Sequence, residues 1–120
     1  MFKKYGIGSL DNYLTQEELS ELLESMEAEF PEVVTPVEIG KSAEGREISG
    51  YLFSAAPNEK RPSILLNGAH HARELTSISM VVWLMLRFLY SWEQGQTDIY
   101  SRLVQNNSVY FIPVVNTDGF

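Results

Sequence analysis

The chain has 120 residues, 44% of them hydrophobic and 12% aromatic, which is enough to bury the core of one domain. Its net charge of −7 argues against DNA or RNA as a partner, because phosphate backbones are bound by basic surfaces. The absence of cysteine excludes disulfides and thiolate-bound metals, although it leaves the compartment open between secreted and cytoplasmic.

Neither end of the sequence nor its interior predicts a membrane partner. The N-terminal residues have too few apolar side chains for a signal peptide. The longest apolar run, residues 80–86, is followed by Arg87 and is much shorter than a membrane-spanning segment. We therefore expect no membrane partner for this chain.

The first predicted element is a helix that begins after Thr15 and ends before Pro31. Thr15 can accept a hydrogen bond from a free N–H group of the first turn, and Glu18 occupies the capping-box position three residues later. Apolar residues then recur at helical spacing: Leu19, Leu22, Leu23 and Met26.

Two strands are predicted next, over residues 37–39 and 48–53. The segment 40–46 between them is rich in turn-forming residues, so we expect an antiparallel hairpin with a long loop. Residues 56–62 are polar and are expected to form a surface connection.

A strand, two helices and a second strand complete the chain. Residues 63–66 form a continuous apolar run, the pattern of a strand buried on both faces. The helix over 74–92 is apolar around most of its circumference and should be largely buried. A short helix near 98–105 precedes a strand at 109–115, where Pro113 predicts a bulge or local edge. The strand–helix–strand order predicts a βαβ unit within an α/β fold, a mixed sheet with covering helices.

The carboxyl ends of the last two strands carry the residues of chemical interest. Sites in open α/β sheets form at such ends, and a parallel pair brings them to the same rim. His71 and Glu74 are three residues apart at a helix entrance, and an imidazole nitrogen with a carboxylate suits zinc. The spacing alone is a weak motif. Alternatively, His70 and His71 are polar loop residues and Glu74 stabilises the N-terminus of its helix.

Four segments together resemble the zinc carboxypeptidase family, the carboxypeptidase A and carboxypeptidase T group of metallopeptidases. They cover nearly the whole chain in the family's order. The single departure is Thr117, where the family usually has proline. The segments are an acidic helix ending in Phe30-Pro31, IGKSAEGR at 39–46, GAHHARE at 68–74 and IPVVNTDGF at 112–120.

The resemblance implies roles for three residues. His71 and Glu74 match two zinc ligands of the family, whose catalytic site holds one zinc ion. Arg73 matches an arginine that helps to hold the substrate backbone; otherwise it is a solvated loop residue or a partner for Glu74. His70 matches no ligand of the family.

Two further segments are expected to be structural. Gly45 and Arg46 should form a tight turn and a packing or ionic contact. Asn116 and Asp118 should build the turn that holds the rim near the site, through bonds from side chain to backbone.

The resemblance also implies that the rest of the catalytic machinery lies downstream. The family's third zinc ligand is a histidine, its general base a glutamate, and an arginine stabilises the oxyanion. No catalytic residue is therefore expected within residues 1–120, which should be the N-terminal portion of a single catalytic domain with an incomplete carboxypeptidase fold. Alone, this portion should be inactive and bind zinc weakly, because two ligands hold the ion poorly.

The function implied for the parent protein is that of a zinc metallocarboxypeptidase, which hydrolyses C-terminal residues from a peptide or protein substrate with zinc-activated water. One alternative is a cell-wall peptide hydrolase or deacylase of the same family. Another is a non-catalytic binding or interaction module that retains a relic metal motif. The uncovered sheet edge beside residues 63–66 also predicts self-association.

Overall fold

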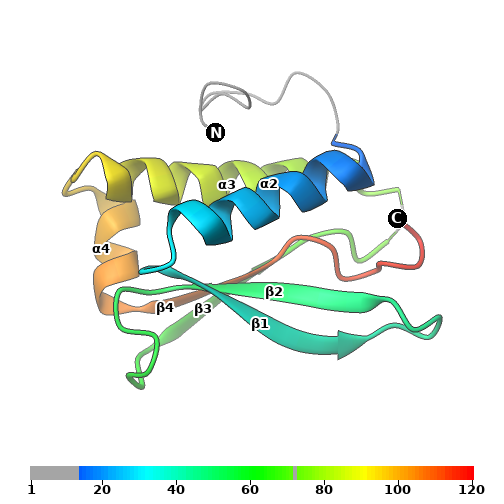
Figure 1. The fold of residues 1–120 in the computed structure, drawn as a ribbon, viewed down its shortest axis with the longest axis horizontal. Coiled ribbons are helices and arrows are strands. Elements are labelled where there is room, and N and C mark those ends of the chain that lie inside the picture. The colour runs from blue at the N-terminus through cyan, green and yellow to red at the C-terminus, as the bar shows by residue number, and fades with distance from the viewer. Residues whose placement is uncertain (1–13, 72) are drawn as a thin grey trace.

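The computed structural model describes residues 14–71 and 73–120, which form a four-stranded sheet and three helices (Figure 1). Helices α2 and α3 lie over the same face of the sheet, and α4 stands at one end of it (Figure 1). This mixed sheet with covering helices confirms the predicted α/β class. The elements are α2 (Gln16–Glu29), β1 (Val34–Lys41), β2 (Glu47–Phe53), β3 (Ser63–Asn67), α3 (Leu75–Glu93), α4 (Ile99–Asn106) and β4 (Ser108–Ile112).

The strand order is β1-β2-β4-β3, with β1, β2 and β4 pairing antiparallel and β3 pairing parallel to β4. The predicted hairpin is therefore β1–β2, and the predicted βαβ unit is β3–α3–β4. Asn67 lies opposite Ile112 at the carboxyl ends of the two parallel strands. The two predicted site segments consequently start from one rim of the sheet.

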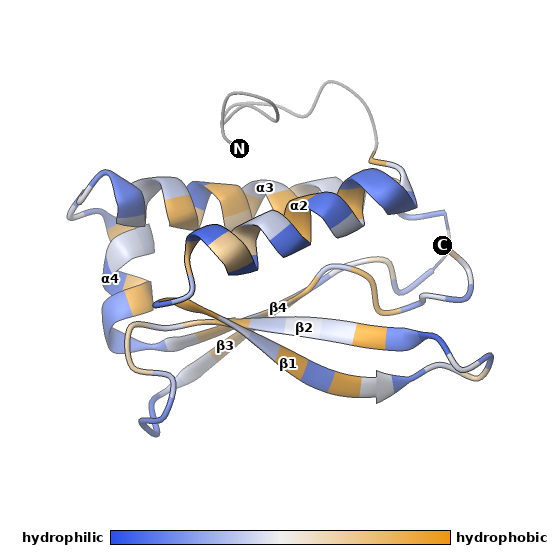
Figure 2. Ribbon diagram, in the orientation of Figure 1, coloured by the Kyte–Doolittle hydropathy of each residue, from blue (hydrophilic) through white to orange (hydrophobic). Residues whose placement is uncertain are grey.

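Helix α2 begins as its sequence predicts. The Thr15 hydroxyl accepts a hydrogen bond from the Glu18 N–H, and the Glu18 carboxylate accepts one from the Thr15 N–H, both at 3.1 Å. The helix buries Leu22 and Met26 completely. Figure 2 shows hydrophobic residues alternating with hydrophilic ones along both α2 and α3, as expected for helices with one face on a sheet.

The core between helices and sheet is organised by three aromatic side chains. Phe88 of α3 packs edge-on against Phe53 of β2 and Phe111 of β4, with ring centroids 6.5 and 5.5 Å apart. Phe53 and Phe111 also contact each other at 4.7 Å. Burying each side chain of this size contributes roughly 1.5–3 kcal/mol, so this cluster holds α3 firmly on the sheet.

Three expectations about the strands need correction. The first strand begins at Val34, earlier than predicted, and includes Pro36; proline is tolerated because β1 is an edge strand among the described residues. The last strand ends at Ile112 instead of reaching residue 115, because Pro113 has no N–H to extend the ladder.

The third correction concerns β3, which was expected to be buried on both faces. Leu65 is 56% exposed. Across the sheet it aligns with Tyr110 and Leu52, on the face opposite the helices. No helix among the described residues covers this face, and β3 has one paired edge only. The apolar pattern of the strand was recognised correctly, but the burial of its second face depends on a covering layer.

Helix α3 buries the residues that face the sheet, including Val82, Met85 and Leu86, whereas Met80 is 56% exposed. It is therefore buried along one face and not all round. Among the described residues, α3 is also long and apolar enough to cross a membrane by length and composition. A core helix meets the same criterion, and the packing of α3 on the sheet accounts for its apolar face.

Candidate metal centre

Residues 68–74, the metal-motif loop, connect β3 to α3 and bring His71 and Glu74 together. Nδ1 of His71 lies 3.3 Å from Oε1 of Glu74. The backbone N–H of His71 also donates to Oε1 at 2.9 Å. Both side chains are open to solvent, with exposed fractions of 84% for His71 and 48% for Glu74. A ligand can therefore reach this pair from outside.

The pair suits two positions of a zinc coordination shell. Tetrahedral zinc with bonds of about 2.0–2.1 Å separates two of its donor atoms by about 3.3–3.4 Å, which matches the observed 3.3 Å. The His71 N–H holds the pKa of the Glu74 carboxyl below its usual value, so Glu74 is available as an anion. Among residues 14–71 and 73–120, no third histidine, aspartate or glutamate completes a metal cluster with them.

The two other residues considered in the loop, His70 and Arg73, have different surroundings. Nε2 of His70 lies 2.9 Å from Oδ1 of Asn67, at the end of β3. The ring of His70 is therefore held at the strand end. Arg73, the predicted substrate-binding residue, is exposed.

The backbone before His71 is tied to the segment that follows β4. The Gly68 N–H donates to the Ile112 carbonyl, and the Val115 N–H donates to the Gly68 carbonyl. The Asn116 N–H donates to the Ala69 carbonyl at 2.8 Å. These bonds hold residues 68 and 69 against residues 112–116 beyond the ends of the two strands, so the start of the metal-motif loop and the segment after β4 are tied together through their backbones.

Gly68 permits this close approach. A Cβ atom built at this position would lie 3.0 Å from the Pro113 carbonyl oxygen and 3.0 Å from that of Ser77. Both are backbone atoms, which cannot move aside as a flexible side chain would. A larger residue at 68 would therefore push the loop away from α3 or from the segment after β4.

Asp118 clamps the hairpin loop onto the same rim. Its carboxylate accepts hydrogen bonds from the Ser42 hydroxyl at 2.6 Å, the Arg46 guanidinium at 2.9 Å and the Glu44 N–H at 3.2 Å. The Ser42 bond, with the help of Arg46, holds the pKa of Asp118 below its usual value. The expected ionic contact of Arg46 is present. Asn116 builds the turn as expected, since its Oδ1 accepts from the Gly119 N–H, whereas the Asp118 carboxylate bonds to the backbone of the hairpin loop at Glu44.

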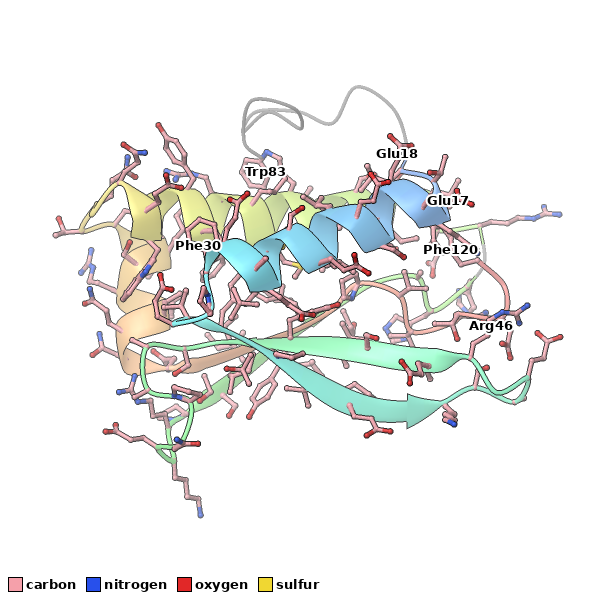
Figure 3. All side chains as sticks on the ribbon, in the orientation of Figure 1. Glu17, Glu18, Phe30, Arg46, Trp83 and Phe120 are labelled. Atoms are coloured by element: carbon pink, nitrogen blue, oxygen red, sulfur yellow. The ribbon has the colours of Figure 1, made fainter. Side chains whose placement is uncertain are left out.

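A pocket of about 290 Å³ lies beside this clamp, between α2, the start of β2 and the segment after β4. Arg46 and Phe120 are on its wall, and Figure 3 shows both at the same end of the molecule. His71 and Glu74 do not line it. The pocket is therefore separate from the candidate metal centre.

Comparison with known proteins places this geometry in context. Residues 19–120 match the family model described as zinc carboxypeptidase. Carboxypeptidase A1 from Sus scrofa is 32% identical over 108 residues, which are 90% of this chain and 25% of that protein. The inactive metallocarboxypeptidase ECM14 from Saccharomyces cerevisiae is 31% identical over 101 residues, 82% of this chain and 23% of that protein.

The fold comparison agrees with the sequence comparison. The crystal structure of thrombin activatable fibrinolysis inhibitor superposes with a TM-score of 0.80 at 25% sequence identity, covering 90% of this chain and 26% of that one. The chain thus spans about a quarter of the length of the curated relatives it matches.

Proposed function

Because the chain belongs to the zinc carboxypeptidase family, we propose that its residues form the N-terminal portion of one zinc-dependent carboxypeptidase domain. The proposed reaction is the hydrolysis of the C-terminal residue of a peptide or protein substrate. The observation that carries the proposal is the 3.3 Å separation of His71 Nδ1 and Glu74 Oε1, just past the carboxyl end of β3, which pairs parallel to β4. Solvent exposure of both side chains supports it further.

In this proposal His71 and Glu74 supply two of the ligands for one zinc ion. The bound ion would polarise the scissile carbonyl and lower the pKa of a water molecule. The hydrogen bond from the His71 N–H keeps the Glu74 carboxyl ionised. Nδ1 of His71 lies beside Oε1 of Glu74, so both atoms can bind the same ion. Arg73, exposed next to Glu74, would hold the backbone of the substrate.

The third ligand is proposed to come from a histidine outside residues 1–120. The sequence contains two histidines, His70 and His71. The ring of His70 contacts Asn67. The general base and the groups that bind the substrate carboxylate would come from the same additional part of the domain. On this account the 120-residue chain alone binds zinc weakly and does not hydrolyse peptides.

A second candidate is a non-catalytic module that retains the metal motif. It is favoured by one specific observation, the 31% identity to an inactive metallocarboxypeptidase from yeast. The two candidates differ in whether a complete domain containing these residues turns over a peptide.

We also propose that the uncovered edge of β3 drives self-association of the chain. Leu65 is exposed on β3, and the strand is paired on one side only among the described residues. Unpaired strand edges with exposed apolar side chains favour pairing with another chain.

Calorimetric titration of zinc tests the metal assignment. We expect weak binding by the chain, loss of binding in His71→Ala and Glu74→Ala, and retention of binding in His70→Ala. Equal zinc affinity in all four proteins would refute the assignment of His71 and Glu74.

A longer version of the chain that includes the following coding sequence distinguishes the two candidate functions. For a carboxypeptidase we expect tight zinc binding and zinc-dependent release of the last residue from a blocked dipeptide with a free carboxyl terminus. Tight zinc binding without release of that residue would favour the non-catalytic module.

A further inference from the structure

One hydroxyl group connects both ends of the metal-motif loop. Ser77, in the first turn of α3, accepts a hydrogen bond through Oγ from the Ala69 N–H at 2.8 Å. The same Oγ donates to the carbonyl oxygen of Glu74 at 2.5 Å. Ala69 stands two residues before His71, so the hydroxyl spans the segment that carries both candidate ligands.

The residue at one end of this link has an unfavourable backbone conformation. Ala69 has a φ of 54°, in the left-handed region that residues with a Cβ rarely adopt. Such a conformation persists only where the surrounding structure holds it in place. Its N–H is held by Ser77 and its carbonyl by the N–H of Asn116 at 2.8 Å. Ala69 is also only 2% exposed, so water does not replace these partners easily.

The other end of the link is the residue that begins helix α3. Glu74 is the N-cap of α3, but its side chain makes no capping hydrogen bond to the helix. Instead its Oε1 accepts the N–H of His71, and its carbonyl accepts the Ser77 hydroxyl and the Ser77 N–H. The Glu74 carboxylate is thus turned back toward His71 while Ser77 fixes its backbone.

We propose that Ser77 is a positioning residue for the candidate metal centre. Its hydroxyl holds Ala69 and Glu74 at a fixed separation, and this sets the relative placement of His71 and Glu74. Ser77 does this by acting as donor and acceptor at one atom, which a hydroxyl can do and a methyl group cannot. The role of Ser77 in zinc binding rests on the proposed function, whereas its control of the loop geometry does not.

Three variants separate this role from general support of the helix. Ser77→Ala removes the hydroxyl, and Ser77→Thr keeps it, since threonine in a helix can also bond to a preceding carbonyl. Ser79→Ala is the matched control, because it makes the same change on the same helix one residue beyond the buried Ile78. Each variant is compared with the unaltered chain by thermal melting, so that a loss of folding is recognised.

The first measurement uses the chain without metal. We expect Ser77→Ala to increase the exchange rates of the Ala69 and His71 amide protons by about tenfold or more, because both hydrogen bonds depend on the locked loop. Ser77→Thr should restore them and Ser79→Ala should leave them unchanged. If the His71 amide exchanges at the same rate in Ser77→Ala and in the unaltered chain, the positioning role is overturned.

The second measurement is zinc titration of the same proteins. We expect Ser77→Ala to weaken zinc binding roughly 10- to 100-fold, the usual effect of losing a group that orients a metal ligand. The threonine variant should bind as the unaltered chain does. A lower melting temperature with unchanged zinc affinity would show that Ser77 supports the helix only. Zinc binding that does not depend on His71 would refute the proposed function, while the amide exchange would still decide the positioning role.

Discussion

The guanidinium of Arg46 lies 2.9 Å from the carboxylate of Asp118, although 72 residues separate them in the chain. The contact joins the hairpin loop between β1 and β2 to the turn that follows β4. With the Ser42 hydroxyl bonded to the same carboxylate, the loop and the turn are fixed to each other beside the candidate metal centre.

The Asp118 clamp should make stability depend on pH. The folded-state pKa of Asp118 is lowered, so its stabilising contribution is present above the unfolded value of about 3.9 and is lost as pH falls through the folded value. We expect Asp118→Asn to lower the melting temperature at pH 7 and to flatten its fall as the pH drops below about 4.

Glu44→Gln is the control for this prediction. Glu44 also pairs with Arg46, at 2.7 Å, but both side chains are mostly exposed, and exposed pairs contribute little. Its melting profile should follow that of the unaltered chain. An Asp118→Asn profile that keeps the original acid dependence would contradict the assignment.

The capping box of α2 should contribute measurably to stability. Thr15→Ala removes the hydroxyl that accepts the Glu18 N–H, and we expect a loss of about 1 kcal/mol. Urea denaturation followed by circular dichroism measures the change. Ser20→Ala, at an exposed position inside the same helix, should change the free energy of unfolding by less than about 0.5 kcal/mol. Equal effects of both changes would argue against the cap.

Two methionines of α3 provide a matched test of the core. Met85 is fully buried, whereas Met80 is 56% exposed. We expect Met85→Ala to cost about 2–5 kcal/mol through lost burial and the cavity it leaves. The same substitution at Met80 should cost less than about 0.5 kcal/mol. Chemical denaturation of both variants checks the difference, and a large cost at Met80 would mean that another surface covers it.

The proposed self-association can be tested at two equally exposed positions. Leu65 on β3 and Ile99 on α4 are each 56% exposed. We expect Leu65→Lys to lower the fraction of associated chain, because a charge blocks pairing at the strand edge. Ile99→Lys should have little effect. Sedimentation velocity over a range of concentrations measures the distribution, and a monomeric unaltered chain would rule out the proposal.

Local sequence signals were sufficient for most of the fold. The Thr15–Glu18 cap and the helical spacing that follows define α2, and the turn-forming segment 40–46 defines the hairpin, because the partners of each residue lie nearby in the chain. The exposure of Leu65 could not be derived in this way. It depends on which layers cover the second face of the sheet, and no short pattern encodes that.

For the candidate site, too, the sequence predicts the local contacts and not the long-range ones. The spacing of His71 and Glu74 is a local signal, and the structure places their donor atoms close together. Ser77 was missed, because a serine in a helical pattern carries no sign of its bond to Ala69. The contact of Arg46 was expected, but its partner Asp118 comes from the far end of the chain, where only the folded arrangement reveals it.

The hydrogen bonds that join residues 68 and 69 to Ile112, Val115 and Asn116 have a consequence for protein engineering. If a metal-motif loop from another protein were grafted onto this scaffold, its backbone would not match the hydrogen-bonding groups of the segment after β4. The two stretches are a single unit of exchange, so a working chimera must transplant them as a pair.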